Sequence, residues 1–405
     1  MAEVAGRVLA YLMLIAHLAD LHLGFRAFHR STAHGFNMRE ADVLDAFSRA
    51  IDQLVQIEPD LVLIAGDVFH SVRPSNAAIA EAFRMFSRLR ARLPHAPVVM
   101  IAGDHDSPRS TETSNILVLF REIAGVSIAV DEVERFRFPN LDCSVHCLPH
   151  NAVARQHGSQ APVLTIEPDS QAARNVLMLH GALTGTAAMR SIPGRAESGG
   201  ASISEQIIGV DRWDYVALGH HHLATEVHPN MWYAGAIERT SSDIWSEPSP
   251  KGFITYDTEV GLARFHPLET RATIDLPPID ATGLDAGDVD HRIRSSVDAI
   301  AGGLQGKMVR IVVSNLPRQV VRELNHRQIR EYKAEALHFQ LDARPPAPRR
   351  IALHQEAVRR QTLPEQVEVY LREHWTLSSE ALTRDRLIAL AKEYVERVGD
   401  SGSDA

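Results

Sequence analysis

Cysteine is scarce in this sequence, with only two among 405 residues, so a framework of disulfides cannot hold the fold together. Cys143 and Cys147 are four positions apart. On a strand they would share one face yet lie too far apart to bond. Their spacing is not a common zinc pattern either. Because few cysteines fit a reducing compartment, we expect a cytoplasmic protein.

Long apolar runs are also missing, and none approaches the ~20 residues that a membrane-spanning helix needs. No membrane association is therefore expected. The apolar stretch 8–18 has the character of a signal peptide, but only Arg7 precedes it and no convincing cleavage site follows. We interpret it as the first buried strand of a soluble fold.

Positive charge is in deficit, since the net charge of −9 argues against a protein that coats DNA through bulk charge. Residues 307–360 depart from this balance, with ten Arg and two Lys against five acidic residues. This stretch is either a solvated basic face or a surface that contacts phosphates, and the sequence leaves both open.

The first hundred residues alternate between strand and helix. Continuous apolar runs predict buried strands at 13–19, 61–65 and 97–102. Apolar residues at helical spacing predict helices around 43–55 and 79–93. This βαβαβ order indicates an α/β core built in layers. Shorter strands follow, and those near 175–179 and 215–218 each run into histidine.

The second part of the chain is expected to hold smaller units. We place a boundary near Thr270, where Pro277 and Pro278 would open a Gly/Asp-rich linker. A small α+β unit follows, with helices at 289–300 and 318–332 and strands at 307–313 and 336–341. Residues 344–350 read as a second linker. The predicted divisions are a core over 12–270, the α+β unit over 271–345, a helical region over 346–400 and a disordered tail over 401–405.

Five short segments rich in Asp, His and Gly stand out, and four of them follow predicted strands. They are His17-Leu-Ala-Asp20-Leu-His22-Leu-Gly24, Gly66-Asp67-Val-Phe-His70, Gly103-Asp104-His105-Asp106, His180-Gly181 and Gly219-His220-His221-His222. Side chains at the carboxyl ends of strands converge in the crevice where open α/β sheets place their sites. Carboxylates and imidazoles suit first-row divalent ions, Mn²⁺ especially. One carboxylate can bridge two ions ~3.5–4 Å apart, the separation used for displacement at phosphorus.

Each segment alone has an ordinary structural explanation. A single Asp-x-His is usually surface chemistry, and a lone buried histidine is more often a hydrogen-bonded core residue than a ligand. With 21 histidines in the chain, some pairs fall close together by accident. Five segments in order, most of them at strand ends, favour a metal centre over these explanations.

The five segments resemble the motif series of the calcineurin-type metallophosphoesterases: Asp-x-His, Gly-Asp, Gly-Asn-His-Asp/Glu, His and Gly-His-x-His. They are most similar to the SbcD nuclease subunits of bacterial SbcCD complexes, which repair DNA double-strand breaks. The blocks 233–240 and 251–253 resemble that subfamily, and the likeness by motif covers about 12–257. It implies an α/β layered core, a β-sandwich flanked by helices, then a small α+β capping domain and C-terminal helices that bind an ATPase partner.

The resemblance also implies roles for individual residues, with two divalent ions that activate the attacking water. The first ion would be held by Asp20, His22 and His222, the second by Asp104, His180 and His220, and Asp67 would bridge them. His105 would contact the scissile phosphate and stabilise or protonate the leaving oxygen, and His70 would orient His105. For His17, Asp106 and His221 we expect support of the ligands rather than direct ligation.

One position departs from the family pattern, because Asp104 stands where the family has Asn. Both residues offer an oxygen to a hard cation, so ligation is retained. The carboxylate makes the loaded site one charge less positive, which should tighten metal binding and weaken the attraction for phosphate. Activity and metal preference therefore depend on this residue.

Three functions fit these patterns. The first is a two-metal DNA exonuclease and endonuclease that uses Mn²⁺ and works with an SbcC-like coiled-coil ATPase; relatives of this kind imply a homodimer. The second is a small-substrate phosphodiesterase or phosphatase of the same superfamily. The third is a DNA-binding scaffold whose site is catalytically weakened at Asp104.

Overall fold

The computed structural model describes residues 13–33, 35–108, 114–155, 166–185, 201–347, 362–374 and 383–400. The chain divides into two compact units, Met1–Pro346 and Ala347–Ala405. Within the described ranges, no helix is both long and apolar enough to cross a membrane. The tail expected at 401–405 lies outside the described residues.

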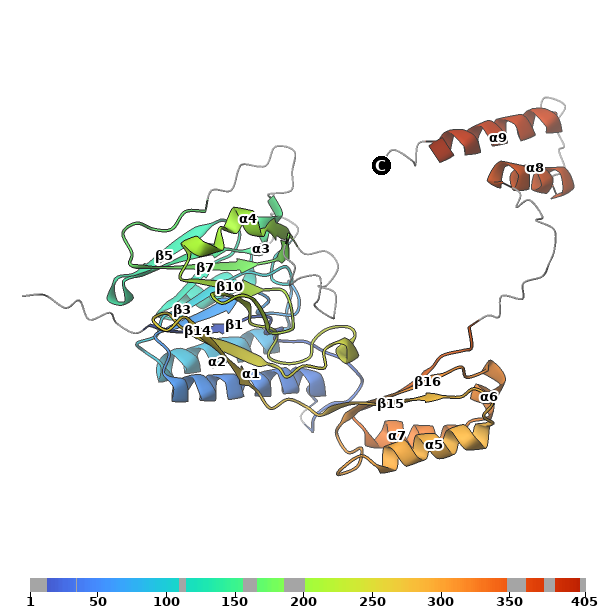
Figure 1. Cartoon of the computed structure of the whole chain (residues 1–405), viewed down its shortest axis with the longest axis horizontal. Helices are drawn as coiled ribbons and strands as arrows, with labels where there is room; N and C mark the ends of the chain where they lie inside the picture. The colour runs from blue at the N-terminus through green and yellow to red at the C-terminus, as the bar shows by residue number, and fades with distance from the viewer. Residues whose placement is uncertain are drawn as a thin grey trace, which may run out of the picture. The chain divides into compact units, whose positions relative to one another are not determined.

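The first sheet of the large unit has six strands in the order β14-β13-β1-β2-β3-β4, of which β1, β3 and β14 are labelled in Figure 1. Four of its strands run parallel to one another. They are β1 (Leu14–Leu18), β2 (Leu61–Ala65), β3 (Val98–Ile101) and β4 (Val126–Ala129). Two antiparallel strands, β13 (Gly252–Asp257) and β14 (Leu262–Pro267), complete the edge beside β1. The three predicted strands before residue 105 are confirmed.

Two helices cover the outer face of this sheet, α1 (Met38–Ile57) and α2 (Asn76–Arg92). Each begins at a capping side chain: Asn37 accepts from the backbone N–H groups of Arg39 and Glu40, and Ser75 accepts from that of Ala78. Their apolar stripes pack into one buried cluster with the sheet, where the rings of Phe47 and Phe86 lie 5.1 Å apart.

The second sheet also has six strands, in the order β11-β12-β10-β7-β6-β5. These are β5 (Glu134–Phe138), β6 (Cys143–Leu148), β7 (Arg174–His180), β10 (Tyr215–Gly219), β11 (Thr225–His228) and β12 (Met231–Tyr233). The two sheets share a buried core in which Leu63 and Val99 from one cluster with Val145, Val176 and Ala217 from the other. Both cysteines lie in β6 as free, buried thiols.

Short elements cover the outer face of the second sheet: α3 (His150–Ala154), α4 (Glu205–Ile208) and the small pair β8 (Ala182–Thr184) and β9 (Ser202–Ser204). The core is therefore a β-sandwich flanked by helices, as the family resemblance implied.

The α+β unit has a parallel sheet of three strands, β15 (Thr273–Asp280), β16 (Met308–Ser314) and β17 (His338–Ala343). The linker expected at Pro277 is wrong, since Pro277 and Pro278 lie within β15. Proline is tolerated there because β15 is an edge strand whose register shifts between Leu276 and Ile279. A strand thus stands where the sequence indicated a break.

Helices pack on this sheet around a buried core of their own. They are α5 (Ala286–Asp298), α6 (Arg318–Glu323) and α7 (His326–Glu335). The single helix expected over 318–332 is wrong, because the chain leaves helical geometry at Leu324 and Asn325 starts a new helix. The Asn325 side chain caps α7 by accepting from the Gln328 N–H, and Leu324 is buried.

The second compact unit contains two helices, α8 (Leu363–His374) and α9 (Arg384–Asp400), which confirms the expected helical C-terminus. Glu368 on α8 pairs with Lys392 on α9 at 2.6 Å. Several large apolar side chains stay exposed on the pair, namely Val369, Tyr370, Leu390 and Tyr394.

Candidate metal centre

The predicted ligands lie where strands of both sheets end. Asp20 and His22 follow β1, Asp67 follows β2, and Asp104 follows β3. His180 is the last residue of β7, while His220 and His222 follow β10. The strands within each of these sets run parallel, so their carboxyl ends meet at one edge of the sandwich.

Glycine makes this convergence possible at two positions. A Cβ added to Gly103 would collide with the carboxylate of Asp67, and one added to Gly219 would collide with the carbonyl oxygen of Ala65. Neighbouring loops therefore approach more closely than any residue with a side chain would allow.

Asp20, His22 and His222 form the first donor group, with ligand atoms that all lie within 4.8 Å of one another. The Nε2 atoms of His22 and His222 are 2.9 Å apart. Asp20 and His22 are fully buried, and the Asp20 carboxylate accepts from the backbone N–H of His220 at 3.0 Å. This is the set that the resemblance implies for the first ion.

Asp104, His180 and His220 form the second donor group. Asp104 Oδ1 lies 2.9 Å from His180 Nε2 and 3.2 Å from His220 Nδ1. Burial alone would raise the pKa of Asp104, but the hydrogen bonds with the two histidines hold it below its usual range. His180 is fixed from behind, since its Nδ1 lies 2.8 Å from the carbonyl oxygen of Ala65. This is the set that the resemblance implies for the second ion.

Asp67 lies between the two groups. Its Oδ2 is 3.8 Å from His22 Nε2 and 3.5 Å from His180 Nε2, so the carboxylate faces one imidazole of each group. It also shares a donor cluster with Asp104 and His105. The placement is the one a bridging ligand requires.

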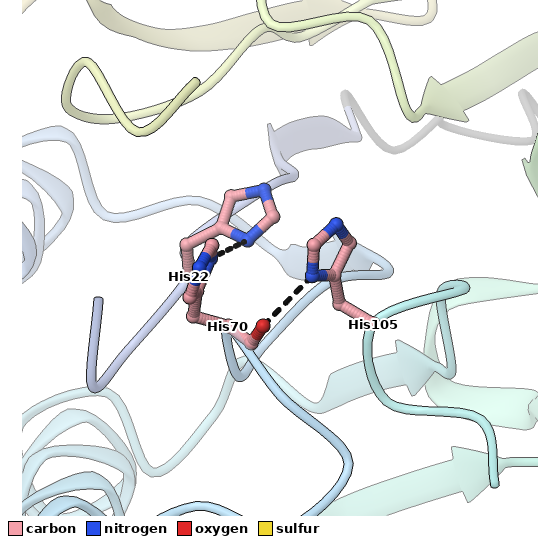
Figure 2. A group of neighbouring side chains, drawn as sticks. All are labelled: His22, His70 and His105. Carbon is pink, nitrogen blue, oxygen red and sulfur yellow. Dashed lines mark hydrogen bonds between the residues drawn. The ribbon is translucent and has the colours of Figure 1, made fainter. Parts of the chain in front are cut away.

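His105 is held next to these donors by the main chain of His70. Figure 2 shows its Nδ1 directed at the His70 carbonyl oxygen, 2.7 Å away. The ring of His70 stacks on that of His105, with ring centroids 5.1 Å apart, and its Nδ1 lies 3.4 Å from Nδ1 of His22. His70 therefore contacts His105 through both its backbone and its ring, and it contacts a donor of the first group through its side chain.

The three residues expected to support the ligands occupy different places. Asp106 joins the loops that carry Asp67 and Asp104, since its carboxylate accepts from the N–H groups of Val68, Phe69 and Gly103. Burial, with the nearby charge of Asp67, raises the pKa of Asp106 to about 7.

His17 lies deeper, within β1, with Nδ1 2.9 Å from the Tyr215 hydroxyl. Burial lowers the pKa of His17 to about 3, so it remains neutral. His221 packs edge-on against the ring of Tyr233 at 4.5 Å. In the described part of the chain, neither histidine belongs to a group of potential metal ligands.

Sequence reasoning missed a buried ion pair behind His222. Glu247 Oε1 lies 3.0 Å from His222 Nδ1, and Lys251 pairs with Glu247 while donating to the His222 carbonyl at 2.7 Å. Burial would raise the pKa of Glu247, but His222 and Lys251 lower it to about 2. A carboxylate next to Nδ1 of His222 fixes the orientation of the imidazole ring and increases the basicity of its Nε2. The only signal in the sequence is an acid and a base four residues apart.

Four of the predicted ligands have a backbone conformation that is unusual for residues other than glycine. The φ angles are 51° at Asp20, 47° at His22, 50° at Asp67 and 104° at His220. Such conformations cost of order 1–3 kcal/mol each and persist only where the surroundings enforce them. Their concentration at one site indicates a functional centre.

The donor set fits two divalent cations. Two imidazole nitrogens face each other at 2.9 Å beside a buried carboxylate, an arrangement that a cation between them would satisfy. His220 Nε2 is buried and has no hydrogen-bond partner among the described residues. Three carboxylates and four imidazoles form a mixed oxygen and nitrogen set, which suits Mn²⁺ and similar ions.

Comparison with known proteins agrees with this geometry. The sequence pattern of the family described as Calcineurin-like phosphoesterase matches residues 13–224, which include all of these donors. The chain belongs to this family. The layered α/β core is consistent with the fold of this family.

Relatives within the family are DNA double-strand break repair proteins Mre11. That of Methanococcus maripaludis is 33% identical over 116 residues, which are 29% of each chain. That of Methanopyrus kandleri is 30% identical over 223 residues, 52% of this chain and 45% of the relative. That of Sulfurisphaera tokodaii is 38% identical over 95 residues, 24% of this chain and 22% of the relative. The chain thus matches less than half of the length of each relative.

Proposed function

We propose that this metallophosphoesterase is the nuclease subunit of a DNA double-strand-break repair complex, acting as an exonuclease and endonuclease. The observation that carries the proposal is the pair of donor groups that face a shared carboxylate, Asp67. Two divalent ions, with Mn²⁺ favoured, would supply an activated water and offset the charge of the phosphate. Asp20, His22 and His222 would hold one ion, and Asp104, His180 and His220 the other.

His105 is suited to act on the leaving oxygen. With Nδ1 donating to the His70 carbonyl, a proton on Nε2 makes the ring an imidazolium that can release this second proton. Its backbone N–H donates to Asp67 Oδ1 at 2.9 Å, so the residue is positioned from the bridging carboxylate itself. This placement supports general acid assistance by His105.

The choice of DNA as substrate is supported by the relatives, which are named as DNA repair proteins. A second support is the basic surface of α6 and α7, where Arg318, Arg322, Arg327 and Arg330 are exposed. Arginines of this kind contact phosphates without reading sequence. In this proposal residues 271–345 form a capping domain beside the nuclease core 12–270.

A coiled-coil ATPase of the SbcC type is the proposed partner, and α8 with α9 is its proposed docking site. Large apolar side chains are exposed on this small helical pair, and exposed apolar patches usually indicate a surface that binds a partner. An amphipathic helix binding a groove of the partner is the expected mode. Deletion of 361–405 should then abolish ATPase binding in a pull-down and spare hydrolysis of simple substrates.

The test is a metal-dependent assay on two substrates, linear duplex DNA and a small chromogenic phosphodiester. We expect Mn²⁺-dependent hydrolysis of both, and none by Asp67→Asn. Hydrolysis of the diester alone would reassign the chain to small substrates. DNA binding without hydrolysis of either substrate would make it a scaffold.

A further inference from the structure

A pocket of about 310 Å³ opens between the β-sandwich and the α+β unit. Its lining comes from four regions: residues 25–28 after β1, His70 after β2, residues 240–242 with Ile244 and Trp245 after β12, and β17. The volume is at the lower end of the ~300–1,000 Å³ range of small-molecule sites. It is large enough for one planar heterocycle and too small for a stacked base pair.

The pocket adjoins the metal centre through His70, which belongs to both. His70 lines the pocket, and its Nδ1 is 3.4 Å from Nδ1 of His22 in the first donor group. Phe25, another lining residue, packs edge-on against the His70 ring at 4.9 Å. A molecule in the pocket would therefore lie beside a phosphate bound at the metal centre.

Aromatic rings form much of the wall and are fixed in place. Phe28 stacks on His338 with ring centroids 3.9 Å apart and planes 16° apart. Trp245 donates from Nε1 to Gln340 at 2.8 Å, and the Arg310 guanidinium lies 5.1 Å from the centre of its ring. Rings held in this way offer flat surfaces at little further loss of entropy, which suits stacking with a planar ligand.

Thr240 gives the wall a polar group without a partner. Its side chain is 1% exposed, and its Oγ1 makes no hydrogen bond to any described residue. A buried hydroxyl left unsatisfied costs ~1–3 kcal/mol, so a ligand that enters the pocket and comes within hydrogen-bond distance of this oxygen gains affinity. At the rim, Arg26 is 57% exposed while its Nε pairs with Glu40 at 2.7 Å.

We propose that this pocket binds one unpaired nucleobase of the DNA substrate, from a nucleotide next to the scissile phosphate. Aromatic faces with hydroxyl and amide groups are the means by which proteins hold unstacked bases. A base within a duplex is stacked and paired, so it enters only from a frayed end or after rotation out of the helix. This inference rests on the proposed function, since it assumes that DNA is the substrate.

The test compares substrates that differ only at this base. One duplex carries an unpaired 2-aminopurine nucleotide at its end, and the other carries an abasic residue at the same position. We expect the rate constant kcat/KM to be about 5- to 150-fold higher for the first, the range that stacking of one base provides. Binding is measured in parallel from 2-aminopurine fluorescence with metal-free protein in EDTA.

Two variants alter the pocket in different ways. Thr240→Val removes the unpartnered hydroxyl at nearly constant volume, and Ser242→Leu fills the pocket from its rim. Both variants should lower the ratio of kcat/KM for the 2-aminopurine substrate to kcat/KM for the abasic substrate, and Ser242→Leu should bring this ratio close to one. Thr255→Val is the matched control, because it removes a buried hydroxyl that contacts His266 outside the pocket. Each rate is divided by the same variant's rate on the chromogenic diester, which corrects for loss of folded protein.

The outcomes separate this proposal from the one on which it rests. Hydrolysis of both DNA substrates at equal rates overturns the pocket assignment and leaves the nuclease intact. If DNA is not hydrolysed at all, the proposed function fails. The fluorescence measurement then still decides the pocket: quenching that Ser242→Leu abolishes and Thr255→Val retains supports it, and unquenched 2-aminopurine refutes it.

Discussion

The two donor groups of the metal centre are built differently behind their ligands. In the first group, His222 is backed by the buried pair of Glu247 and Lys251, and His22 by the ring of His70. In the second, His180 is backed by a backbone carbonyl, and the Asp104 side chain is 23% exposed. The first group is thus enclosed and braced by charged side chains, while the second has a carboxylate at its open side.

This difference suggests separate duties for the two halves. A ligand set braced by buried charges has a fixed geometry and resists exchange of its ion. A carboxylate at the open side lies where a phosphate must approach, so its charge acts on substrate as well as on metal. Four variants test this division through their effect on metal binding. Asp67→Asn should affect both groups, His105→Ala neither, Glu247→Gln the first and Asp104→Asn the second.

The largest effect is expected from Asp67→Asn, which removes the charge shared by both groups. Metal binding should weaken at both positions, and hydrolysis should fall to background. Elemental analysis of the metal content, together with the rate on the chromogenic diester, provides the check. Loss of a single ion with the other bound at full affinity would show that Asp67 belongs to one group only.

His105→Ala should leave both groups loaded and lower the rate by ~10²–10⁴, the usual contribution of a general acid. The two measurements are metal content and kcat on DNA. His105→Gln is a useful companion, because it keeps polarity without an ionisable proton. A variant that loses its ions would mean that His105 is a ligand and not a proton donor.

Glu247→Gln should weaken the first group and spare the second, by ~10–100-fold in metal affinity. Calorimetric titration with Mn²⁺ would resolve two binding events. We expect the dissociation constant of only one of them to change in this variant. Because the change leaves Lys251 buried and unpaired, the double variant with Lys251→Met separates destabilisation from lost orientation. Glu205→Gln breaks a comparable pair with His228 away from the site and serves as the control. Equal shifts in both binding events would contradict the division between the groups.

Asp104→Asn should produce the smallest change and act on the second group alone. We expect weaker Mn²⁺ binding and, at saturating Mn²⁺, a severalfold rise in turnover, since a more positive site attracts phosphate more strongly. The check is a Mn²⁺ titration of the nuclease rate for both forms. Lower turnover at unchanged metal affinity would give the Asp104 carboxylate a catalytic role of its own.

Local patterns in the sequence predicted the strands of the core well. Apolar runs bounded by helices fixed β1, β2 and β3, because a buried parallel strand needs nothing more than a continuous apolar segment. Pro277 misled the prediction, because its tolerance depends on β15 being an edge strand, which is a property of the assembled sheet. The same holds for the helix break at Leu324, where burial of the side chain decides the chain path.

Contacts between distant segments or through the backbone could not be predicted. Glu247 reaches His222 only after β13 has paired beside β1 and returned the chain to the site. His105 contacts the main-chain oxygen of His70 as well as its ring, and the sequence motif does not indicate the main-chain contact. The pocket that His70 lines likewise depends on four regions that meet only in the folded chain.

The left-handed backbone at Asp20, His22, Asp67 and His220 sets activity against stability. Glycine adopts this geometry freely, so replacing any one of these residues by glycine removes a donor and releases conformational strain at the same time. Inactive variants should then melt at higher temperature than the metal-free parent. A screen for thermal stability alone would therefore favour variants that have lost these metal ligands. Mutations that raise the melting temperature without loss of activity must be sought away from the strand ends.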